Sequence, residues 1–400
     1  MHKNKNKKVI NNSLECLITH PSVLRAIIDY SIIALKGTGR IIVGDAPMQG
    51  CNLEKLLEIS GYNEMFKFYN DNSVNIKPVD FRKYATVVDK NNILIKKVFN
   101  ENEFLTVELG DKSKFYSSER NNKRYKVSDY NECVTNTFHT NDTHKYVINK
   151  NVLIADVIIN VPKPKCHRLA GITGCLKNIV GITHDKACLP HRTVGSTQEG
   201  GDEYLNKSMI KKMISKTLDM KLKFEKKNYY LFALLMRYQF GVLYYLNKTR
   251  KDNALIGSWY GNDTIWRTVL DLNHILLYAD KNGIMSDKPQ RVEFNIADMI
   301  ICGEGDGPVA PEPKHLGIII AGKESASIDR VICEIMGFDF KKIPCVYYAA
   351  QDEALNYYFL NNCVLKSNVK SLNNKVIDKI NCPKNWCFKP HNSWKGYIEK

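Results

Sequence analysis

Apolar and polar residues alternate along this chain with two periods, one typical of helices and the other typical of strands. In residues 21–36 the apolar positions recur every three or four residues after Pro21, and a Gly-Thr-Gly sequence follows, which predicts a helix that ends in a turn. Short β-branched runs predict buried strands at 40–44, 157–161, 298–302 and 316–321. Loops and helical patterns separate most of these runs, as they do in sheets of parallel strands. We therefore predict an α/β fold, a mostly parallel sheet with flanking helices.

The pattern changes between these segments, which predicts arms and insertions around one α/β core. The core is predicted to comprise residues 21–62, 147–204 and 255–345. An N-terminal arm at 1–20 and a C-terminal extension at 346–400 flank it. Alternating stretches between polar loops predict a β-rich insertion at 63–146, and residues 205–254 are predicted to be a helical insertion.

Within that helical insertion, the segment 205–252 has an unusual distribution of charge. Residues 206–227 hold eight Lys against Asp219 and Glu225, whereas residues 228–247 are nearly all apolar or aromatic. One interpretation is a long helix, or a helical hairpin, that packs on the core. The other is a patch that docks on anionic lipid, since interfacial helices combine a basic face with Tyr, Phe and Leu.

Charged residues directly follow four of the predicted strands. They are Asp45, then the group Lys163, Lys165 and His167, then Glu304 with Asp306, and finally Lys323. The carboxyl ends of parallel strands meet at one edge of a sheet, which is where open α/β proteins bind ligands. The cations after residues 157–161 also precede a segment with helical periodicity at 171–181, and a helix N-terminus favours anions. The pattern therefore predicts an anion-binding site at this edge.

The residues at this edge have the side chains that proton transfer and anion binding require. His167, Lys165 and Asp45 are the candidate catalytic residues, because a positioned His or a desolvated Lys exchanges protons near neutral pH. Candidate substrate-binding residues are Lys163, Lys177, Asn178, Arg192, Asn262 and Asp263. For Lys163 the alternative is a structural ion pair with Asp45 or Asp306. We favour this structural role for Lys163 and ligand contact for Lys165.

A divalent metal ion is a further hypothesis for the same edge of the sheet. His167, His191, Glu304 and Asp306 combine the imidazole and carboxylate ligands that suit such an ion. Their spacing matches no closed metal-binding motif, and the alternative is that each has a structural role. The chain has no GxGxxG sequence, so no nicotinamide fingerprint is predicted.

The amino-acid composition and the net charge indicate which kinds of molecule this protein binds. The 400 residues are 44% hydrophobic and 25% charged, which is typical of a globular chain with a sizeable core. The formal net charge of +16 at pH 7 favours anionic partners, namely small molecules, an acidic membrane surface or nucleic acid. Charge is the sole support for nucleic acid, because the chain has no basic-aromatic motif and no zinc-finger spacing.

Cysteine usage and the N-terminal sequence indicate a compartment. The twelve cysteines are scattered without a CxxC pair, which is typical of reduced thiols and argues against an iron–sulfur binding run. No apolar signal region precedes Asn11, and no stretch is uncharged for long enough to span a bilayer. We expect a cytoplasmic protein, with contact to the inner face of the membrane through 205–252 as the alternative.

One long motif resembles a known family. The run Asp156-Val-Ile-Ile-Asn160-Val-Pro162-Lys163-x-Lys165-x-His167, continued by Leu176-Lys177-Asn178-x-x-Gly181, resembles the signature of the domain-of-unknown-function family 362. The sequences Gly44-Asp45-Ala46-Pro47 and Gly303-Glu304-Gly305-x-Gly307-Pro308 are similar to its flanking motifs. The resemblance spans residues 40–340 and implies an α/β domain without a settled activity. It also implies a link to bacterial surface polysaccharides, while the ferredoxin-like segments of some members are absent from this chain.

Three functional hypotheses follow from these observations. The first is an enzyme that acts on an anionic small molecule, such as a phosphorylated or nucleotide-linked sugar, through the Lys, His and Asp residues at strand ends. The second is a redox protein with an iron–sulfur cluster built from the dispersed cysteines. The third is a non-catalytic protein that binds anions or membranes through its basic segment.

Overall fold

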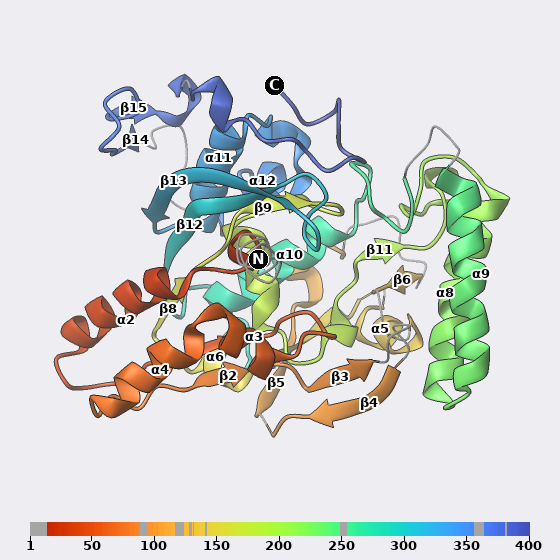
Figure 1. Ribbon diagram of the computed structural model, residues 1–400, viewed down its shortest axis with the longest axis horizontal. Coiled ribbons are helices and arrows are strands. Elements are labelled where there is room, and N and C mark those ends of the chain that lie inside the picture. The colour runs from red at the N-terminus through yellow and green to blue at the C-terminus, as the bar shows by residue number, and fades with distance from the viewer. Residues whose placement is uncertain are drawn as a thin grey trace, which may run out of the picture.

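The main sheet is built around two long strands, β12 (Val292–Glu304) and β13 (Glu312–Gly322), which pair antiparallel (Figure 1). The computed structural model describes residues 14–88, 94–101, 103–116, 124–127, 130, 132–140, 142–248, 254–355, 364–380 and 382–400. Strands β8 (Val157–Asn160) and β9 (Lys165–His167) both run parallel to β12, one beside its beginning and the other beside its end. Pro162 and Pro164 lie between β8 and β9, where their missing amide hydrogens interrupt the ladder.

The α/β class is confirmed, but the described strands form mixed sheets. The runs predicted at 298–302 and 316–321 belong to β12 and β13, and the loop that joins them contains no helix. Without such a crossover the two strands must run antiparallel. Glu304 therefore pairs with Glu312, whereas Lys323 follows the opposite end of the hairpin, where Gly322 pairs with Asn295. The prediction that all four charged groups meet at one edge of the sheet is wrong for Lys323.

The segment 171–181 was expected to be a helix, and most of it is not. Its first residues form β10 (Gly171–Thr173), which pairs antiparallel with β9. Only α7 (Cys175–Asn178) is α-helical, and a 3-10 turn follows over Ile179–Ile182. Gly171 has a φ of 78°, a conformation that favours glycine and that completes the tight turn between β9 and β10. The apolar residues that suggested a helix are buried from several directions instead.

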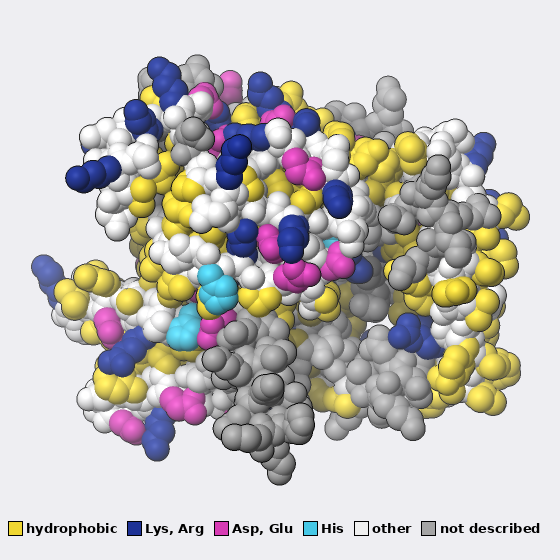
Figure 2. Space-filling view, turned by 45° about the horizontal axis from the view of Figure 1, so that its top comes forward, with side chains coloured by type: hydrophobic (Ala, Val, Ile, Leu, Met, Phe, Trp, Pro, Cys, Tyr) yellow, Lys and Arg dark blue, Asp and Glu magenta, His cyan; other side chains and the backbone are white. Residues whose placement is uncertain are grey.

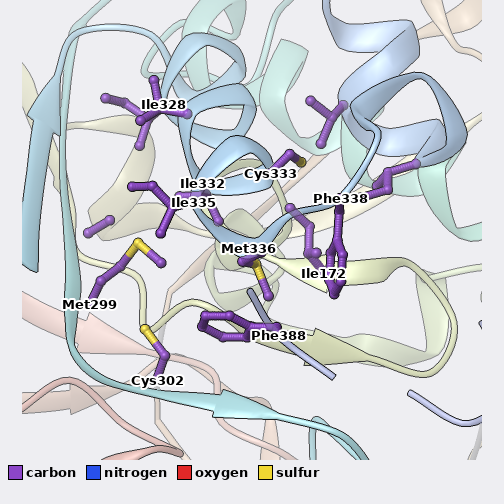
Figure 3. Packing of buried hydrophobic residues seen from close by; sticks show 14 of the residues in the cluster. Ile172, Met299, Cys302, Ile328, Ile332, Cys333, Ile335, Met336, Phe338 and Phe388 are labelled. Carbon is purple, nitrogen blue, oxygen red and sulfur yellow. The ribbon is translucent and has the colours of Figure 1, made fainter. Parts of the chain in front are cut away.

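One hydrophobic core lies between the main sheet and α11 (Ser325–Met336). Figure 3 shows Ile328, Ile332 and Met336 of α11 in one cluster with Met299 and Cys302 of β12. The chain beyond residue 346 contributes to this core as well, because Phe388, Trp394 and Ile398 are buried in it. The C-terminal extension is therefore part of the core and also crosses its surface.

A second core joins the predicted β-rich insertion to the rest of the chain. It contains Val107 and Tyr146 from the antiparallel pair β5 (Phe104–Glu108) and β7 (Lys145–Asn149), with Leu272 and Ile275 of α10 (Ile265–Tyr278). Upstream elements are α2 (Pro21–Leu35), as predicted, then β1 (Val43–Asp45), α3 (Leu53–Ser60), α4 (Tyr62–Asp71), β2 (Pro78–Asp80), β3 (Tyr84–Val88) and β4 (Leu94–Phe99). Shorter elements are β6 (Tyr125–Lys126), α5 (Glu132–Phe138), α6 (Lys150–Leu153), β11 (Arg192–Thr193), α12 (Pro344–Ala349), β14 (Val364–Leu365) and β15 (Lys375–Val376).

Residues 209–248 form a helical hairpin of α8 (Met209–Lys226) and α9 (Tyr230–Lys248), which lie side by side at one end of the molecule (Figure 1). Ser208 begins α8, because its side chain accepts a hydrogen bond from the Lys211 amide. Among the described residues, no helix is long and apolar enough to cross a membrane.

Candidate functional site

Three lysines and one aspartate form the candidate site, where the β1 loop meets the segment 165–188. The Asp45 carboxylate is near enough to act electrostatically on Lys165 and Lys186, and Lys177 acts on Lys186. Lys165 belongs to β9, Lys177 to α7 and Lys186 to the 3-10 turn Lys186–Cys188. Asp45 ends β1, and the amide of the next residue donates a hydrogen bond to the Gly181 carbonyl at 2.8 Å. Lys186 Nζ in turn donates to the Pro47 carbonyl at 2.7 Å, so two segments far apart in sequence are held together here.

Burial disfavours the positively charged form of each of the three lysines. Burial lowers the pKa of Lys165, Lys177 and Lys186 to about 8 each, and the neighbouring charge of Lys163 lowers that of Lys165 further. Lys165 Nζ donates to the Leu17 carbonyl at 2.6 Å, and Lys186 to backbone carbonyls. In the part of the chain that the structure describes, none of the three forms an ion pair with a carboxylate. Their charge therefore remains available to an anion.

His167 is held in a defined tautomer by the turn that follows it. Its Nδ1 accepts hydrogen bonds from the amides of Leu169 at 3.1 Å and Ala170 at 3.2 Å. Burial, and then the charge of Lys177, hold the pKa of this imidazole well below its ordinary value. The ring is therefore neutral, and we assign its proton to Nε2 because Nδ1 is an acceptor. His167 is thus a hydrogen-bond donor.

His191 is in the other neutral tautomer, with its proton on Nδ1. Its Nδ1 lies 2.8 Å from the Leu189 carbonyl, to which only a protonated nitrogen can donate. Burial, and then the charge of Lys177, lower the pKa of His191 to about 3, so this ring is neutral too. Its Nε2 then carries a lone pair. Lys177 lowers the pKa of both histidines, which places its charge near each ring.

Asp45 is open to solvent on one side, yet protein atoms crowd its other sides. This burial raises the pKa of its carboxyl, while the charge of Lys186 acts in the opposite direction. The carboxyl also lies close against Gly181, since a Cβ at that position would be 2.1 Å from Asp45 Oδ1. A glycine is required there because any side chain would displace the carboxylate.

Lys163 forms a buried ion pair. Its Nζ is 2.6 Å from Asp298 Oδ2, and the two side chains are 3% and 0% exposed. The same oxygen accepts a hydrogen bond from the His20 amide at 2.9 Å. Lys163 therefore forms a structural ion pair, as the alternative role predicted. Its partner is Asp298, and the predicted partners Asp45 and Asp306 are wrong.

Four other residues predicted to bind substrate have contacts within the protein. Asn178 donates to the buried Asn160 at 2.8 Å, and Arg192 is paired with Glu203 at 2.9 Å. Asn262 accepts hydrogen bonds from the amides of Thr264 and Ile265, at the start of α10. Asp263 accepts from the Trp266 indole at 2.8 Å and pairs with Arg267 at 3.1 Å. Each of these four side chains therefore has a hydrogen-bond or ion-pair partner within the protein.

Three of the predicted metal ligands also have hydrogen-bond partners within the protein. Glu304 accepts a hydrogen bond from the Lys389 amide at 3.0 Å, and Asp306 accepts one from Asn392 at 2.8 Å, so both hold the C-terminal segment. The lone pair of His167 Nδ1 is already engaged by backbone amides. Across the described ranges, no group of three or more His, Cys, Asp and Glu residues is placed to hold a metal ion.

Lys186 is the site residue that the sequence did not single out. It lies between His184 and His191, in the same basic stretch as Lys165 and Lys177. That density of positive residues was the available signal. Spacing alone could not show that Lys186 returns to the β1 loop.

The family described as "Domain of unknown function (DUF362)" matches residues 112–334, which is more than half of the chain. The matched region contains Lys165, His167, Lys177, Lys186 and His191, whereas Asp45 lies before it. No curated protein and no solved structure matches the chain.

Proposed function

Because the chain belongs to the DUF362 family, which is described only as a domain of unknown function, we propose a function from its own residues: it is an enzyme that acts on an anionic small molecule at Lys165, Lys177 and Lys186. The observation that carries this proposal is the charge of the three lysines. Three positive charges in a partly buried place destabilise the free protein, although the Asp45 carboxylate offsets part of the charge of Lys165 and Lys186. A bound phosphate or carboxylate supplies the missing negative charge through charge-assisted hydrogen bonds.

The neighbouring residues suit a phosphorylated or nucleotide-linked sugar. The lysines and the Nε2 proton of His167 donate to phosphate oxygens, and the Asp45 carboxylate accepts hydrogen bonds from sugar hydroxyls. A lysine with a pKa of about 8 is neutral in part of the population near neutral pH, so Lys165 serves as the general base. A role in surface-polysaccharide metabolism rests on the sequence resemblance.

Binding is tested first, on the purified full chain. We expect inorganic phosphate, sugar phosphates and nucleotide sugars to raise the melting temperature, whereas the corresponding neutral sugars do not. Lys177→Met and Lys186→Met should each weaken anion affinity roughly 10- to 100-fold, the usual magnitude for a charge-assisted hydrogen bond. Lys281→Met, which removes an exposed lysine elsewhere, should leave the shift unchanged.

Turnover is tested next, with the sugar phosphate or nucleotide sugar that gives the largest shift. Product formation followed by phosphorus NMR should be lost in Lys165→Met. Binding of the anion without any turnover would favour the non-catalytic alternative, in which the same lysines only bind. Equal shifts with neutral sugars would refute the anion site itself.

A further inference from the structure

α9 exposes an apolar and aromatic face that no described part of the chain covers. Leu231, Leu235, Tyr238, Val242 and Tyr245 follow one another at four- and three-residue spacing, so they line one side of the helix. Their exposed fractions run from 50% for Leu235 to 71% for Tyr245. Five more large side chains at the start of α9 or within it are exposed, namely Tyr229, Tyr230, Phe232, Tyr244 and Leu246. Apolar faces of this extent usually mark an interaction site.

The opposite side of α9 is the one that packs on α8. Ala233 and Leu243 are buried there, and Leu243 belongs to a cluster with Ile214 of α8. Residues 231 and 233 differ by about 200° around a helix, so α8 cannot also cover the exposed stripe. Figure 2 shows hydrophobic side chains along the outer edge of this hairpin, away from the body of the protein.

α8 adds positive charge to the same hairpin. The exposed lysines on α8, with one just before the helix and one just after it, are Lys207, Lys212, Lys216, Lys223, Lys226 and Lys227. The hairpin has two acidic residues, and both have partners: Asp219 lies 2.5 Å from Lys126, and Glu225 lies 2.8 Å from Lys221. Exposed Met209, Met213 and Met220 lie between the lysines, so apolar and cationic side chains share the surface of α8.

We propose that the α8–α9 hairpin docks this protein on an anionic lipid surface. The stripe on α9 enters the boundary between headgroups and acyl chains, where tyrosines place their rings in the apolar zone and their hydroxyls in water. The exposed lysines of α8 contact the anionic headgroups. Since no described helix is long and apolar enough to cross a bilayer, α9 lies in the plane of the interface.

Charge favours lipid over a second copy of the chain. α9 contains no acidic residue, and its polar exposed side chains include Arg237. A second hairpin on this face would bring a second set of lysines close to the first, and like charges across an interface oppose association. An anionic lipid surface is complementary to the lysines and apolar beneath its headgroups. This inference is independent of the anion site at Lys165, Lys177 and Lys186.

The experiment is cosedimentation of the full chain with phosphatidylcholine vesicles, prepared with and without phosphatidylglycerol. We expect binding to the anionic vesicles, weaker binding at high salt, and little binding to the neutral ones. The variant Leu235→Glu/Val242→Glu should bind the anionic vesicles roughly 10- to 100-fold more weakly. Tyr238→Ser, a milder change in the same stripe, should weaken binding in the same direction. Ile33→Glu alters an equally exposed apolar residue on α2 and is the matched control.

A lysine variant separates charge from apolar contact. Lys216→Gln/Lys223→Gln/Lys227→Gln should reduce the preference for anionic vesicles. Failure to bind either kind of vesicle, or equal binding by the Leu235→Glu/Val242→Glu variant, overturns the proposal. So does a dimer in light scattering that this variant dissociates, because a second copy would then occupy the face.

Discussion

Lys163 and Lys165 are two residues apart, yet their side chains have different surroundings. Lys163 forms an ion pair with Asp298, whereas Lys165 donates to backbone carbonyls and keeps its charge without a carboxylate partner. Residues two apart in a regular strand point to the same side, but Lys163 lies between β8 and β9, where Pro162 and Pro164 interrupt the strand. The two lysines can therefore have different surroundings. The sequence predicted a structural ion pair for Lys163 but named Asp45 or Asp306 as its partner, because no local pattern shows which distant carboxylate meets this lysine.

Removing Lys163 tests its structural role. Lys163→Met leaves the Asp298 carboxylate buried without its counterion, and we expect a loss of ~3–5 kcal/mol in the free energy of unfolding. Urea denaturation measures this change. The double variant Lys163→Met/Asp298→Met removes both charges and should regain part of the loss. A single variant as stable as the natural protein would contradict the structural assignment.

Lys177→Met should stabilise the free protein while weakening anion binding. The pKa of Lys177 is lowered to about 8 in the fold, against an ordinary value of 10.5, so its charge opposes folding. This cost is fully present below the folded pKa and disappears as pH rises towards the unfolded value. The variant should gain on the order of 1–2 kcal/mol near pH ~7, and the gain should shrink between pH ~8 and ~10.5.

Urea denaturation of the natural protein and the variant across that pH range measures the difference. Lys281→Met is the control, because this lysine is exposed and lies outside the candidate site. A gain that is the same at every pH would show that packing, and not charge, explains it.

At the scale of elements, the site depends on the contact between the β1 loop and the 3-10 turn Ile179–Ile182. Ala46 bonds to the Gly181 carbonyl, and the absence of a side chain at Gly181 leaves room for the Asp45 carboxylate. Only the packing of the two segments shows that a side chain at position 181 would occupy the space of the Asp45 carboxylate.

Gly181→Ala should move the Asp45 carboxylate without unfolding the protein. The displaced atom is the end of a side chain, so we expect a stability loss below ~1 kcal/mol. Turnover of the best substrate should fall roughly 10- to 100-fold, as a misplaced site group typically causes. Gly50→Ala is the matched control in the same loop, since an added Cβ there meets nothing within 4 Å. If Asp45→Asn is harmless while Gly181→Ala is not, the effect does not pass through Asp45.

At the scale of the whole molecule, the lysines behind the net charge of +16 include two groups to which we assign different roles. Part of it is concentrated in the three lysines of the candidate site, and part lies on the exposed surface of α8. The first is partly buried and has its pKa lowered, whereas the second is exposed. Their responses to pH should therefore differ.

Anion binding at the site should depend on pH in a range that ordinary lysines do not share. The site lysines are protonated below a pKa of about 8, so their charge is complete below this value and is lost as pH rises through it. We expect the thermal shift caused by inorganic phosphate to fall steeply between pH ~7 and ~9. Binding to anionic vesicles should change much less over this range, because that binding depends on the exposed surface of α8 and on the apolar stripe of α9. Parallel loss of both would contradict the separate assignments.

The sequence by itself determined the α/β class, the helix at α2, the family and the basic segment around Lys165 and Lys177. These depend on local periodicity and on residue types that lie close together in the chain. The tertiary structure alone decided the mixed strand directions, the return of Lys186 to the β1 loop, and the pairing of Lys163 with Asp298. It also decided that Glu304 and Asp306 hold the C-terminal segment. Such pairings join residues far apart in sequence, and their energies come from burial and contact geometry that no local pattern encodes.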